Sequence, residues 1–280
     1  MAKSGHALEI QFKPELKAVP CQFPVQSLTF LITNSLQVSN RHETAPVHYN
    51  LRVVEMAIAS DILAKKLGVW AKARRDSNLQ TSSLRSVMDA YCGEWNGHDV
   101  KEGSNLVKKM IEAVDAVLSM RDGYTHREAA EELGLTTDEF QRSYLSKLPV
   151  KFEKLKLYQR ARHVYRESLR VLQTLELLQK KPQPTSDTVY LIRFGQLMNE
   201  SQADLHHLNE SSNDKLNEIC SIALANGAFG SRVTGTGWGG SVVHLTTLDK
   251  LPAPSHALTE QYYKKEFPGI GHVELTEGNH

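Results

Sequence analysis

GSRVTGTGWGGSVVHL, at residues 230 to 245, places four glycines in one short turn ahead of an apolar, β-branched run. Glycine has no Cβ, so the backbone N–H groups of such a turn can bind an anion, or another main chain can approach closely. The turn therefore indicates phosphate chemistry nearby, although a glycine-rich turn by itself is more often structural. The glycines are Gly235, Gly237, Gly239 and Gly240.

The elements around the turn exclude a dinucleotide-binding βαβ unit. Gly235, Gly237 and Gly240 satisfy G-x-G-x-x-G, but that fingerprint needs a strand before it and a helix after it. Here LNEICSIALANG (216–227) predicts a helix that ends at a glycine, and SVVHLT (241–246) predicts a strand. The order is reversed, and the sequence contains no G-x-x-x-x-G-K-[ST] phosphate loop.

The composition favours a small molecule as the partner. The 280 residues carry 33 basic and 32 acidic side chains, which argues against binding to nucleic acid or to an anionic membrane surface. No run of about 20 apolar residues occurs, which argues against a membrane span. Three cysteines without C-x-x-C spacing favour a reducing compartment, so a cytoplasmic location is expected. They are Cys21, Cys92 and Cys220.

The periodicity of the apolar residues predicts strands at both ends of the chain and helices between them. Residues 7–35 alternate as strands are expected to do, and the chain is helical in character from about residue 81 to 228. Residues 47–68 repeat apolar side chains at three- and four-residue steps, which predicts an amphipathic helix. Long helices are also expected at 150–179 and 189–208, separated by KKPQPTSD with its two prolines.

For two further patterns, a structural role is favoured over a role in binding DNA or a metal ion. THREAAEELGLTTDEFQRSYL (125–145) has the helix, glycine, helix order of a DNA-binding motif, but Asp138 and Glu139 stand where phosphates would require basic residues. An ordinary helical hairpin is expected instead. Glu200 and Asp204 lie four apart and could touch a magnesium ion, but a solvated helix face is favoured. No spacing of histidines and carboxylates completes a metal site, so no metal ligand is assigned.

The loop from Ser39 to Tyr49 is a candidate ligand-binding segment. SNRHETAPVHY combines hydroxyls, an amide, a guanidinium and a phenol near the start of a predicted helix, where exposed N–H groups favour anions. In the alternative, Ser39, Asn40 and Arg41 form a solvated turn and Tyr49 packs at the start of the helix. The residues alone leave both interpretations open.

RVTGTGWGG resembles the third signature motif of the GHMP small-molecule kinases, and further segments narrow the resemblance to galactokinase, its fungal branch especially. The resemblance covers most of the chain. It implies an α+β fold of the GHMP kinase C-terminal type, in which a small antiparallel sheet from residues 7–35 and 230–246 is covered by many helices. Five segments carry it in order: HALEIQFKPELKA (6–18), FLITNSLQVSNRHETAPVHYNLRVVE (30–55), KLYQRARHVYRESLRVL (156–172), LMNESQ (197–202) and ICSIALANGAFGSRVTGTGWGG (219–240).

The resemblance implies ligand-binding roles for the loop before the first long helix. Tyr49 corresponds to the tyrosine that packs on or hydrogen-bonds the sugar in galactokinases. N-acetylgalactosamine kinases usually have phenylalanine there, so galactose is the expected sugar. Ser39, Asn40 and Arg41 look like the fungal S-N-K triplet that contacts the nucleotide. Arginine in place of lysine keeps the charge and changes its geometry from a compact ammonium to a planar fork.

The same resemblance places the phosphoryl-transfer machinery elsewhere. TGTGWGG (234–240) is similar to the family's T-G-A-G-W-G-G, which packs close to a phosphate loop from the other half of the protein. Thr236 replaces alanine, and its bulk is expected to disturb that packing. The family's G-E-H-x-D-Y segment, its P-x-G-x-G-L-S-S-S loop and its catalytic arginine and aspartate have no counterpart, so no catalytic residue is assigned. ATP and Mg²⁺ are the cofactors expected at the complete site.

Together these features predict the C-terminal half of a galactokinase-like protein. Residues 1–70 would supply the strands, the ligand loop and the following helix at a junction with a missing half. Residues 71–280 would form the GHMP kinase C-terminal-type helical domain. The chain stops at EGNH, where the family is expected to continue to a closing strand. Alone, the chain is expected to be catalytically incomplete.

Three functions are compatible with the resemblance. In its complete form the protein would transfer the γ-phosphate of ATP to the C1 hydroxyl of galactose. The alternative is a sensor that binds galactose and ATP and relieves a transcriptional repressor. The third is an inactive remnant that folds poorly, because half of an interdomain site leaves apolar surface uncovered. The features that distinguish enzyme from sensor lie in the missing half.

Overall fold

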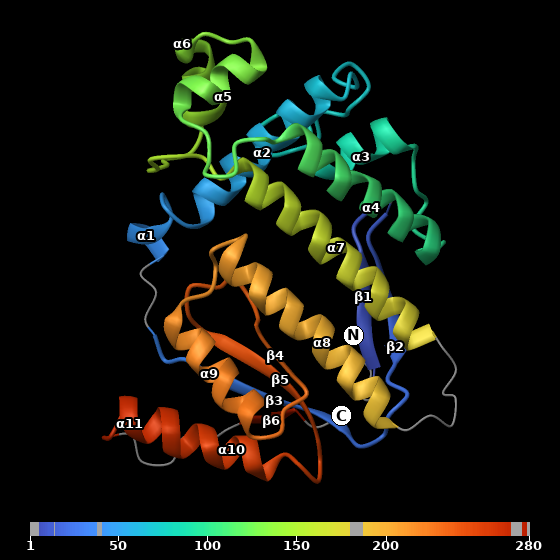
Figure 1. The fold of residues 1–280 in the computed structure, drawn as a ribbon, viewed down its shortest axis with the longest axis vertical. Coiled ribbons are helices and arrows are strands. Elements are labelled where there is room, and N and C mark those ends of the chain that lie inside the picture. The colour runs from blue at the N-terminus through green and yellow to red at the C-terminus, as the bar shows by residue number, and fades with distance from the viewer. Residues whose placement is uncertain (1–5, 14, 38–40, 180–186, 270–275, 279–280) are drawn as a thin grey trace. The chain divides into compact units, whose positions relative to one another are not determined.

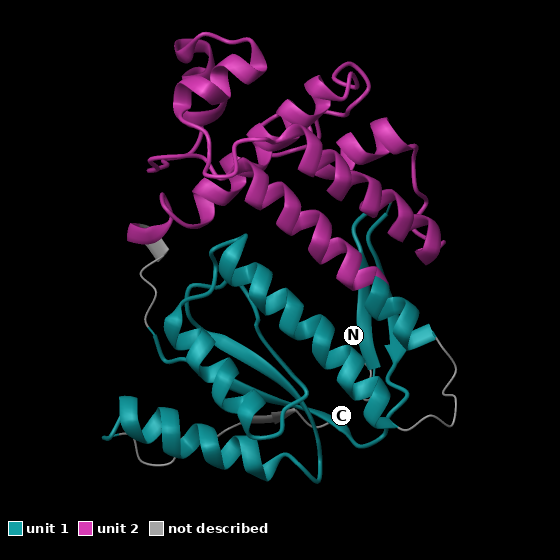
Figure 2. Cartoon of the chain, in the orientation of Figure 1, with its two compact units in different colours: residues 1–39, 173–280 teal, residues 40–172 magenta. Residues whose placement is uncertain are grey.

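The chain folds into two compact units, which are coloured separately in Figure 2. Unit 1 combines residues 1–39 with 173–280, and unit 2 comprises residues 40–172. The predicted division near residue 70 concerns a junction with a missing half, and it stays a prediction. The computed structural model in Figure 1 describes residues 6–13, 15–37, 41–179, 187–269 and 276–278.

Unit 1 is built on a four-stranded antiparallel sheet with the strand order β4-β5-β3-β6. Its longest pairing joins β3 to β5, so strands from opposite ends of the chain lie side by side at its centre (Figure 1). The predicted α+β fold is confirmed, with helices in the majority. The strands are β3 (Leu28–Asn34), β4 (Gly230–Val233), β5 (Ser241–Thr247) and β6 (Thr276–Gly278).

Two expectations about the strands were wrong. The segment near residue 7 does not join the sheet of residues 230–246, because β1 (His6–Gln11) pairs with β2 (Lys17–Gln22) as a separate two-stranded hairpin. Strand β2 itself lies within residues 7–35, which were predicted to form strands. The family's closing strand was expected to be absent, but β6 pairs with β3 close to the C-terminus.

Both faces of the four-stranded sheet bury apolar side chains. Leu28 of β3 belongs to a cluster with Leu191 and Met198. Leu31 points to the opposite face and belongs to a second cluster, with Leu216 and the C-terminal helices. The covering helical segments are α8 (Asp187–His207), α9 (Asp214–Ala225), α10 (Pro252–Leu258), the π-helical turn η2 (Thr259–Tyr263) and α11 (Lys264–Glu266).

Helix α8 approaches strand β4 through a pair of glycines. A Cβ on Gly195 would lie 2.1 Å from the carbonyl oxygen of Phe229, and a Cβ on Gly230 would lie 2.6 Å from Gly195 Cα. One turn along the helix, Asn199 donates to the Phe229 carbonyl at 3.3 Å and accepts from the Ser231 N–H at 2.9 Å. The absence of two side chains therefore lets this helix hydrogen-bond directly to the strand.

Gly195→Ala is expected to lower the free energy of unfolding by about 1–3 kcal/mol, because the new methyl group overlaps the Phe229 carbonyl and the helix must move away from β4. Urea denaturation of the purified variant measures the change. The matched control is Gln196→Ala on the exposed side of the same helix, expected to change stability by less than about 0.5 kcal/mol. Equal midpoints for the two variants would contradict the close-packing argument.

A buried histidine joins three strands of the four-stranded sheet, β3, β4 and β5. His244 of β5 is fully buried, and its two ring nitrogens lie 2.9 Å from Thr33 Oγ1 and 2.8 Å from Ser231 Oγ. Burial lowers the pKa of His244 to about 3. The ring is therefore neutral at physiological pH, and its hydrogen bonds connect β5 to β3 on one side and to β4 on the other.

The low pKa of His244 makes the stability of unit 1 sensitive to acid. The unfolded chain takes up this proton near pH 6.5 and the folded chain only near pH 3, so stability should fall by roughly 1.4 kcal/mol per pH unit across that window. Chemical denaturation at pH 7.5 and pH 5 measures the slope. His244→Gln should flatten it, and an unchanged slope in that variant would assign the acid sensitivity to other groups.

Within the described residues, unit 2 consists of helices joined by loops, with one isolated β-bridge. The last turns of its longest helix, from Gln173, count with unit 1. The helical segments are α1 (Arg41–Thr44), α2 (Tyr49–Lys66), α3 (Leu84–Cys92), α4 (Val100–Val117), α5 (His126–Leu133), α6 (Thr137–Phe140), the π-helical turn η1 (Gln141–Leu145) and α7 (Leu157–Gln179).

Helix α2 has the predicted position but lacks the predicted amphipathic character. From Leu51 to Ala64 it is buried on nearly all sides, charged residues included. Glu55 is fully buried, and it accepts from Arg160 Nε at 2.7 Å and from the Lys156 N–H at 2.6 Å. Asp61, also buried, accepts from Arg75 Nη1 and from the Tyr144 hydroxyl, each at 2.7 Å. Internal partners for these carboxylates explain why a helix with polar residues on several sides is buried.

Helix α7 begins at Leu157, several residues later than predicted. Before it, Leu155 forms the isolated β-bridge with Tyr124 through two backbone hydrogen bonds of 2.7 and 2.8 Å. This pairing holds the chain in an extended conformation where the sequence pattern is already helical. The predicted proline break at 180–187 lies almost wholly outside the described residues.

The predicted hairpin at residues 125–145 consists of the short helices α5 and α6 followed by the π-helical turn. Gly134 ends α5 in the left-handed conformation, with φ of 67°. Thr136 and Glu139 form a reciprocal capping box at the start of α6. Glu139 therefore has a structural role at the position where a DNA-binding helix would be expected to carry a basic residue.

Candidate functional site

The glycine turn follows a backbone path that requires glycine. All residues from 237 to 240 have positive φ, between 58° and 152°. Trp238 is the non-glycine among them, and its N–H donates to the Ser211 carbonyl at 2.7 Å, which fixes this unusual conformation. A Cβ on Gly237 would lie only 2.4 Å from the same carbonyl oxygen. The turn is therefore packed directly against the main chain of the segment between α8 and α9.

The turn also contacts the segment that follows β3. The Ser35 N–H donates to the Gly240 carbonyl at 2.8 Å, and a Cβ on Gly239 would lie 3.3 Å from the Gln37 carbonyl oxygen. The glycines were expected either to bind an anion or to let another main chain approach closely. The described residues show the close approach of another main chain. Anion binding by the remaining amides stays a prediction.

Thr236 and Gly235 lie at the exposed tip of this turn. Nothing within 4 Å would meet a Cβ on Gly235, so the tip has open space around it. The Thr236 side chain is exposed and does not belong to the buried core of unit 1. Whether it disturbs packing against a phosphate loop from another part of a longer protein stays a prediction.

Gly237→Ala is expected to be the damaging change in this turn, because it adds both a clash with the Ser211 carbonyl and a side chain at φ of 83°. A loss of about 2–4 kcal/mol in the free energy of unfolding is expected. Thr236→Ala, in the same turn, should stay within about 0.5 kcal/mol of the parent chain. A thermal melt of each variant checks the pair, and similar losses in both would contradict the assignment of Thr236 to an exposed tip.

Tyr49, the predicted sugar-binding residue, is the first residue of α2 and is 61% exposed. The helix behind it is fixed in position by the buried pair of Glu55 and Arg160. Asn50, the next residue, donates through its side chain to the Pro149 carbonyl at 3.0 Å. Tyr49 is therefore an accessible phenol at the start of a rigid helix, and the alternative in which it packs into the protein is not what the structure has.

The predicted nucleotide triplet is largely outside the described residues. Ser39 and Asn40 fall there completely. Arg41 is the first residue of α1, and its side chain is likewise not described. Tyr49 belongs to unit 2 and the glycine turn to unit 1, so each is described within its own unit. The roles of all these residues stay predictions.

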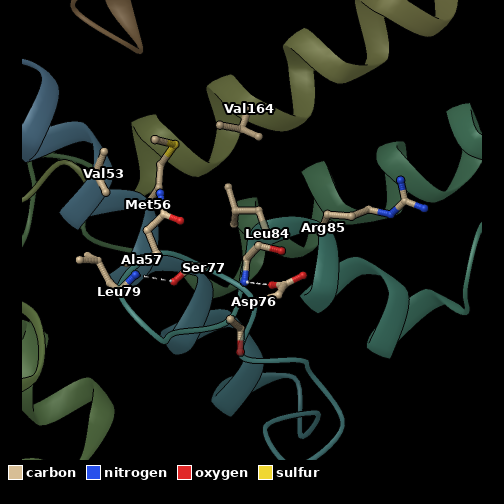
Figure 3. A pocket seen from close by; sticks show the side chains of 12 residues that line it. Val53, Met56, Ala57, Asp76, Ser77, Leu79, Leu84, Arg85 and Val164 are labelled. Carbon is tan, nitrogen blue, oxygen red and sulfur yellow. Dashed lines mark hydrogen bonds between the residues drawn. The ribbon is translucent and has the colours of Figure 1, made fainter. Parts of the chain in front are cut away.

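Unit 2 contains a pocket that the sequence did not indicate (Figure 3). Its volume is about 400 Å³, and α2, α3, the loop between them and Val164 of α7 line it. Polar groups at its rim already have hydrogen-bond partners within the protein. Asp76 accepts from the Ser83 N–H at 3.1 Å and from Ser86 Oγ at 2.7 Å. The Ser82 hydroxyl, 1% exposed, has no hydrogen-bond partner among the described residues. None of the predicted site residues lines this pocket.

The described residues contain no cluster of three or more His, Cys, Asp and Glu side chains suited to a metal ion. Glu200 is exposed, as expected for a solvated face, but Asp204 is 6% exposed, so that interpretation was wrong for Asp204. Cys220 is buried, which raises the pKa of its thiol to about 11. Among the described helices, none has the length and apolar character needed to cross a membrane.

Comparison with known proteins first identifies the class of domain. Residues 189–264, which run from α8 through the glycine turn to the C-terminal helices, match the family model "GHMP kinases C terminal". The chain therefore carries a GHMP kinase C-terminal domain. The solved structure of Lactococcus lactis galactokinase complexed with galactose has the same fold, with a TM-score of 0.57, 18% identity, and coverage of 99% of this chain and 53% of that one.

Curated relatives then identify the kind of GHMP protein. The chain is 61% identical over 277 residues to the galactokinase of Candida parapsilosis, 57% identical over 276 residues to that of Candida albicans, and 42% identical over 291 residues to that of Saccharomyces cerevisiae. It is a homologue of the galactokinases. These matches cover 96–98% of this chain and 54% of each relative, so the chain spans about half the length of the curated relatives it matches.

Proposed function

We propose that the complete protein phosphorylates galactose at the C1 hydroxyl with ATP, and that this chain is its C-terminal half. The observation that carries the proposal is the identity of 57–61% to Candida galactokinases across nearly every residue of the chain. The relatives' extra length leaves room for the sugar segment, the phosphate loop and the catalytic pair that the chain lacks. The chain alone is then catalytically incomplete.

In this proposal the chain positions substrates, and it does not carry out the chemistry. Tyr49 offers an exposed phenol that can stack on the sugar ring or hydrogen-bond one of its hydroxyls. The glycine turn lies against the main chain and presents an open tip at Gly235 and Thr236, against which a phosphate loop can pack. Ser39, Asn40 and Arg41 would contact the nucleotide.

In this proposal Mg²⁺ is supplied at the site of the complete protein. Phosphoryl transfer requires Mg²⁺ beside the phosphates, and the described residues offer no cluster of ligands for it. Bound there, the ion would neutralise charge on the transferring phosphoryl group. The residues of this chain would contribute binding and orientation of galactose and the nucleotide base or ribose.

A chimera tests the proposed activity. The N-terminal part of the Candida parapsilosis galactokinase, outside its match to this chain, is fused ahead of residue 1, and coupled ADP release is measured with ATP, Mg²⁺ and galactose. Turnover that depends on galactose, with little on N-acetylgalactosamine and none without sugar, is expected. A chimera that folds, binds galactose and ATP, and releases no ADP would favour the sensor, in which a transcriptional repressor is the further partner.

Tyr49→Phe in the same chimera isolates the role of the phenol. Loss of one hydrogen bond to the sugar should raise the KM for galactose about 3- to 12-fold and leave the KM for ATP unchanged. The matched control is Tyr91→Phe, which removes the hydroxyl of another exposed tyrosine in unit 2. An unchanged galactose KM in the Tyr49 variant would remove the hydrogen bond from the proposal and leave stacking as the contact.

A further inference from the structure

The pocket of unit 2 has an apolar floor to which three helices contribute. Val53, Met56 and Ala57 come from α2, Leu84 from the start of α3, and Val164 from α7. Figure 3 shows these side chains gathered around the same space. The volume of about 400 Å³ lies within the range of pockets that enclose small molecules. The pocket is therefore large enough to bury most of a small ligand.

The loop between α2 and α3 that lines this pocket is held in one shape by its own hydrogen bonds. Ser77 Oγ accepts from the Leu79 N–H at 3.3 Å and from the Thr81 N–H at 3.0 Å, and it lies 2.6 Å from Thr81 Oγ1. Leu79, which also lines the pocket, is 5% exposed. A ligand would therefore not have to order this loop, and the ordering of loops is one of the main free-energy costs of binding.

Ser82 supplies the pocket with a buried polar group that lacks a partner. Its N–H donates to Asp61 Oδ1 at 3.1 Å and its carbonyl accepts from Ser60 Oγ, so its backbone is fixed on both sides. Ser82 lines the pocket and is 1% exposed, and its hydroxyl has no hydrogen-bond partner among the described residues. A buried hydroxyl without a partner destabilises the folded chain. A ligand that hydrogen-bonds Ser82 would remove this cost.

The charged groups around the pocket disfavour an anionic ligand. Asp76 places a carboxylate at the rim. The Arg85 guanidinium points away from the pocket in Figure 3, and it donates to Asp89 through Nε at 2.8 Å and to the Trp95 carbonyl through Nη2 at 2.6 Å. An anion would therefore meet a carboxylate without a free cation among the lining residues. A sugar is disfavoured too, because the apolar floor would leave several of its hydroxyls without partners.

We propose that this pocket binds a neutral, mainly apolar small molecule whose single hydrogen-bonding group reaches the Ser82 hydroxyl. The apolar floor provides the burial, and Ser82 fixes the orientation of the ligand. The carboxylate of Asp76 selects against an anion of the same shape. The inference does not depend on the proposed function, and the chain by itself is sufficient to test it.

Indole is the probe, because it is flat and neutral and has one N–H donor. It is titrated into the ¹⁵N-labelled chain, and the amide shifts should change in residues 53–57 and 76–85. Ser82→Ala should weaken indole binding about 3- to 12-fold, the value of one hydrogen bond. The same variant should bind indene, which has nearly the same shape and no N–H, as well as the parent chain does.

Two charged and neutral analogues test the selection against anions. Indole-3-carboxylate should bind roughly 10-fold more weakly than indole-3-carboxamide, its neutral counterpart of the same size. Equal affinities for the two analogues would contradict the electrostatic part of the proposal.

A matched pair of variants tests whether indole binds in this pocket. Val164→Phe adds bulk to the floor from α7 and should weaken indole binding by roughly 10-fold or more. Val171→Phe, two turns along the same helix, is the control, because Val171 is 52% exposed and does not line the pocket. A thermal melt of each variant comes first, and Ser82→Ala with indole and indene provides the answer if the Val164 variant does not fold.

Three results would overturn the proposal. The first is no indole binding up to its solubility limit, because water would then be the occupant. The second is binding that a folded Val164→Phe variant leaves unchanged, because the indole would then lie elsewhere. The third is an equal loss of indole and indene binding in Ser82→Ala, because the hydroxyl would then support the shape of the pocket and make no bond to the ligand.

Discussion

The antiparallel pairing of β3 with β5 is the constraint on which unit 1 depends. It joins Leu28–Asn34 to Ser241–Thr247 along their whole length and so closes the unit around a long intervening stretch of chain. The register places Asn34 opposite Ser241, which puts the end of β3 beside the glycine turn and allows the Ser35 N–H to reach the Gly240 carbonyl. The shape of the turn is therefore set by tertiary pairing as well as by its glycines.

Helix α8 packs closely against this sheet because the two residues at the contact, Gly195 and Gly230, have no side chains. Gly195 and Gly230 let the helix approach so closely that Asn199 can hydrogen-bond the two peptide groups on either side of Gly230. His244 complements this contact from within the sheet, where its neutral ring connects three strands. Close packing and a small number of buried polar bonds thus fix the strand that leads directly into the glycine turn.

The sequence predicted the secondary-structure elements that follow from local periodicity and the family resemblance that follows from the glycine motif. The strands flanking the turn, α2, α8 and α9 followed from spacing, and the family resemblance followed from the glycine motif. The sequence patterns did not predict features that depend on contacts between residues far apart in the chain. The delayed start of α7 depends on a bridge to Tyr124, and the burial of α2 depends on partners such as Arg160 for Glu55. The separate pairing of β1 with β2 could not be predicted either, because a strand pattern does not specify its partner.

The candidate site was predictable only in part, for a similar reason. The exposure of Tyr49 at a helix start agrees with a ligand-binding role, and the tight packing of Gly237 explains why glycine is needed at that position. The pocket beside α3 had no signal in the sequence, because α2 and α7 meet there from distant positions. Ser39 and Asn40 lie outside the described residues, so the nucleotide contact stays a prediction.

The central claim is that the chain holds binding residues of a galactokinase-type site without the groups that transfer the phosphoryl group. The most direct measurement is coupled ADP release by the purified chain alone, with ATP, Mg²⁺ and galactose, after a cooperative thermal melt has confirmed that it is folded. We expect no ADP release above the blank without sugar. Release that depends on galactose would contradict the claim and would mean that these 280 residues contain a complete phosphoryl-transfer site.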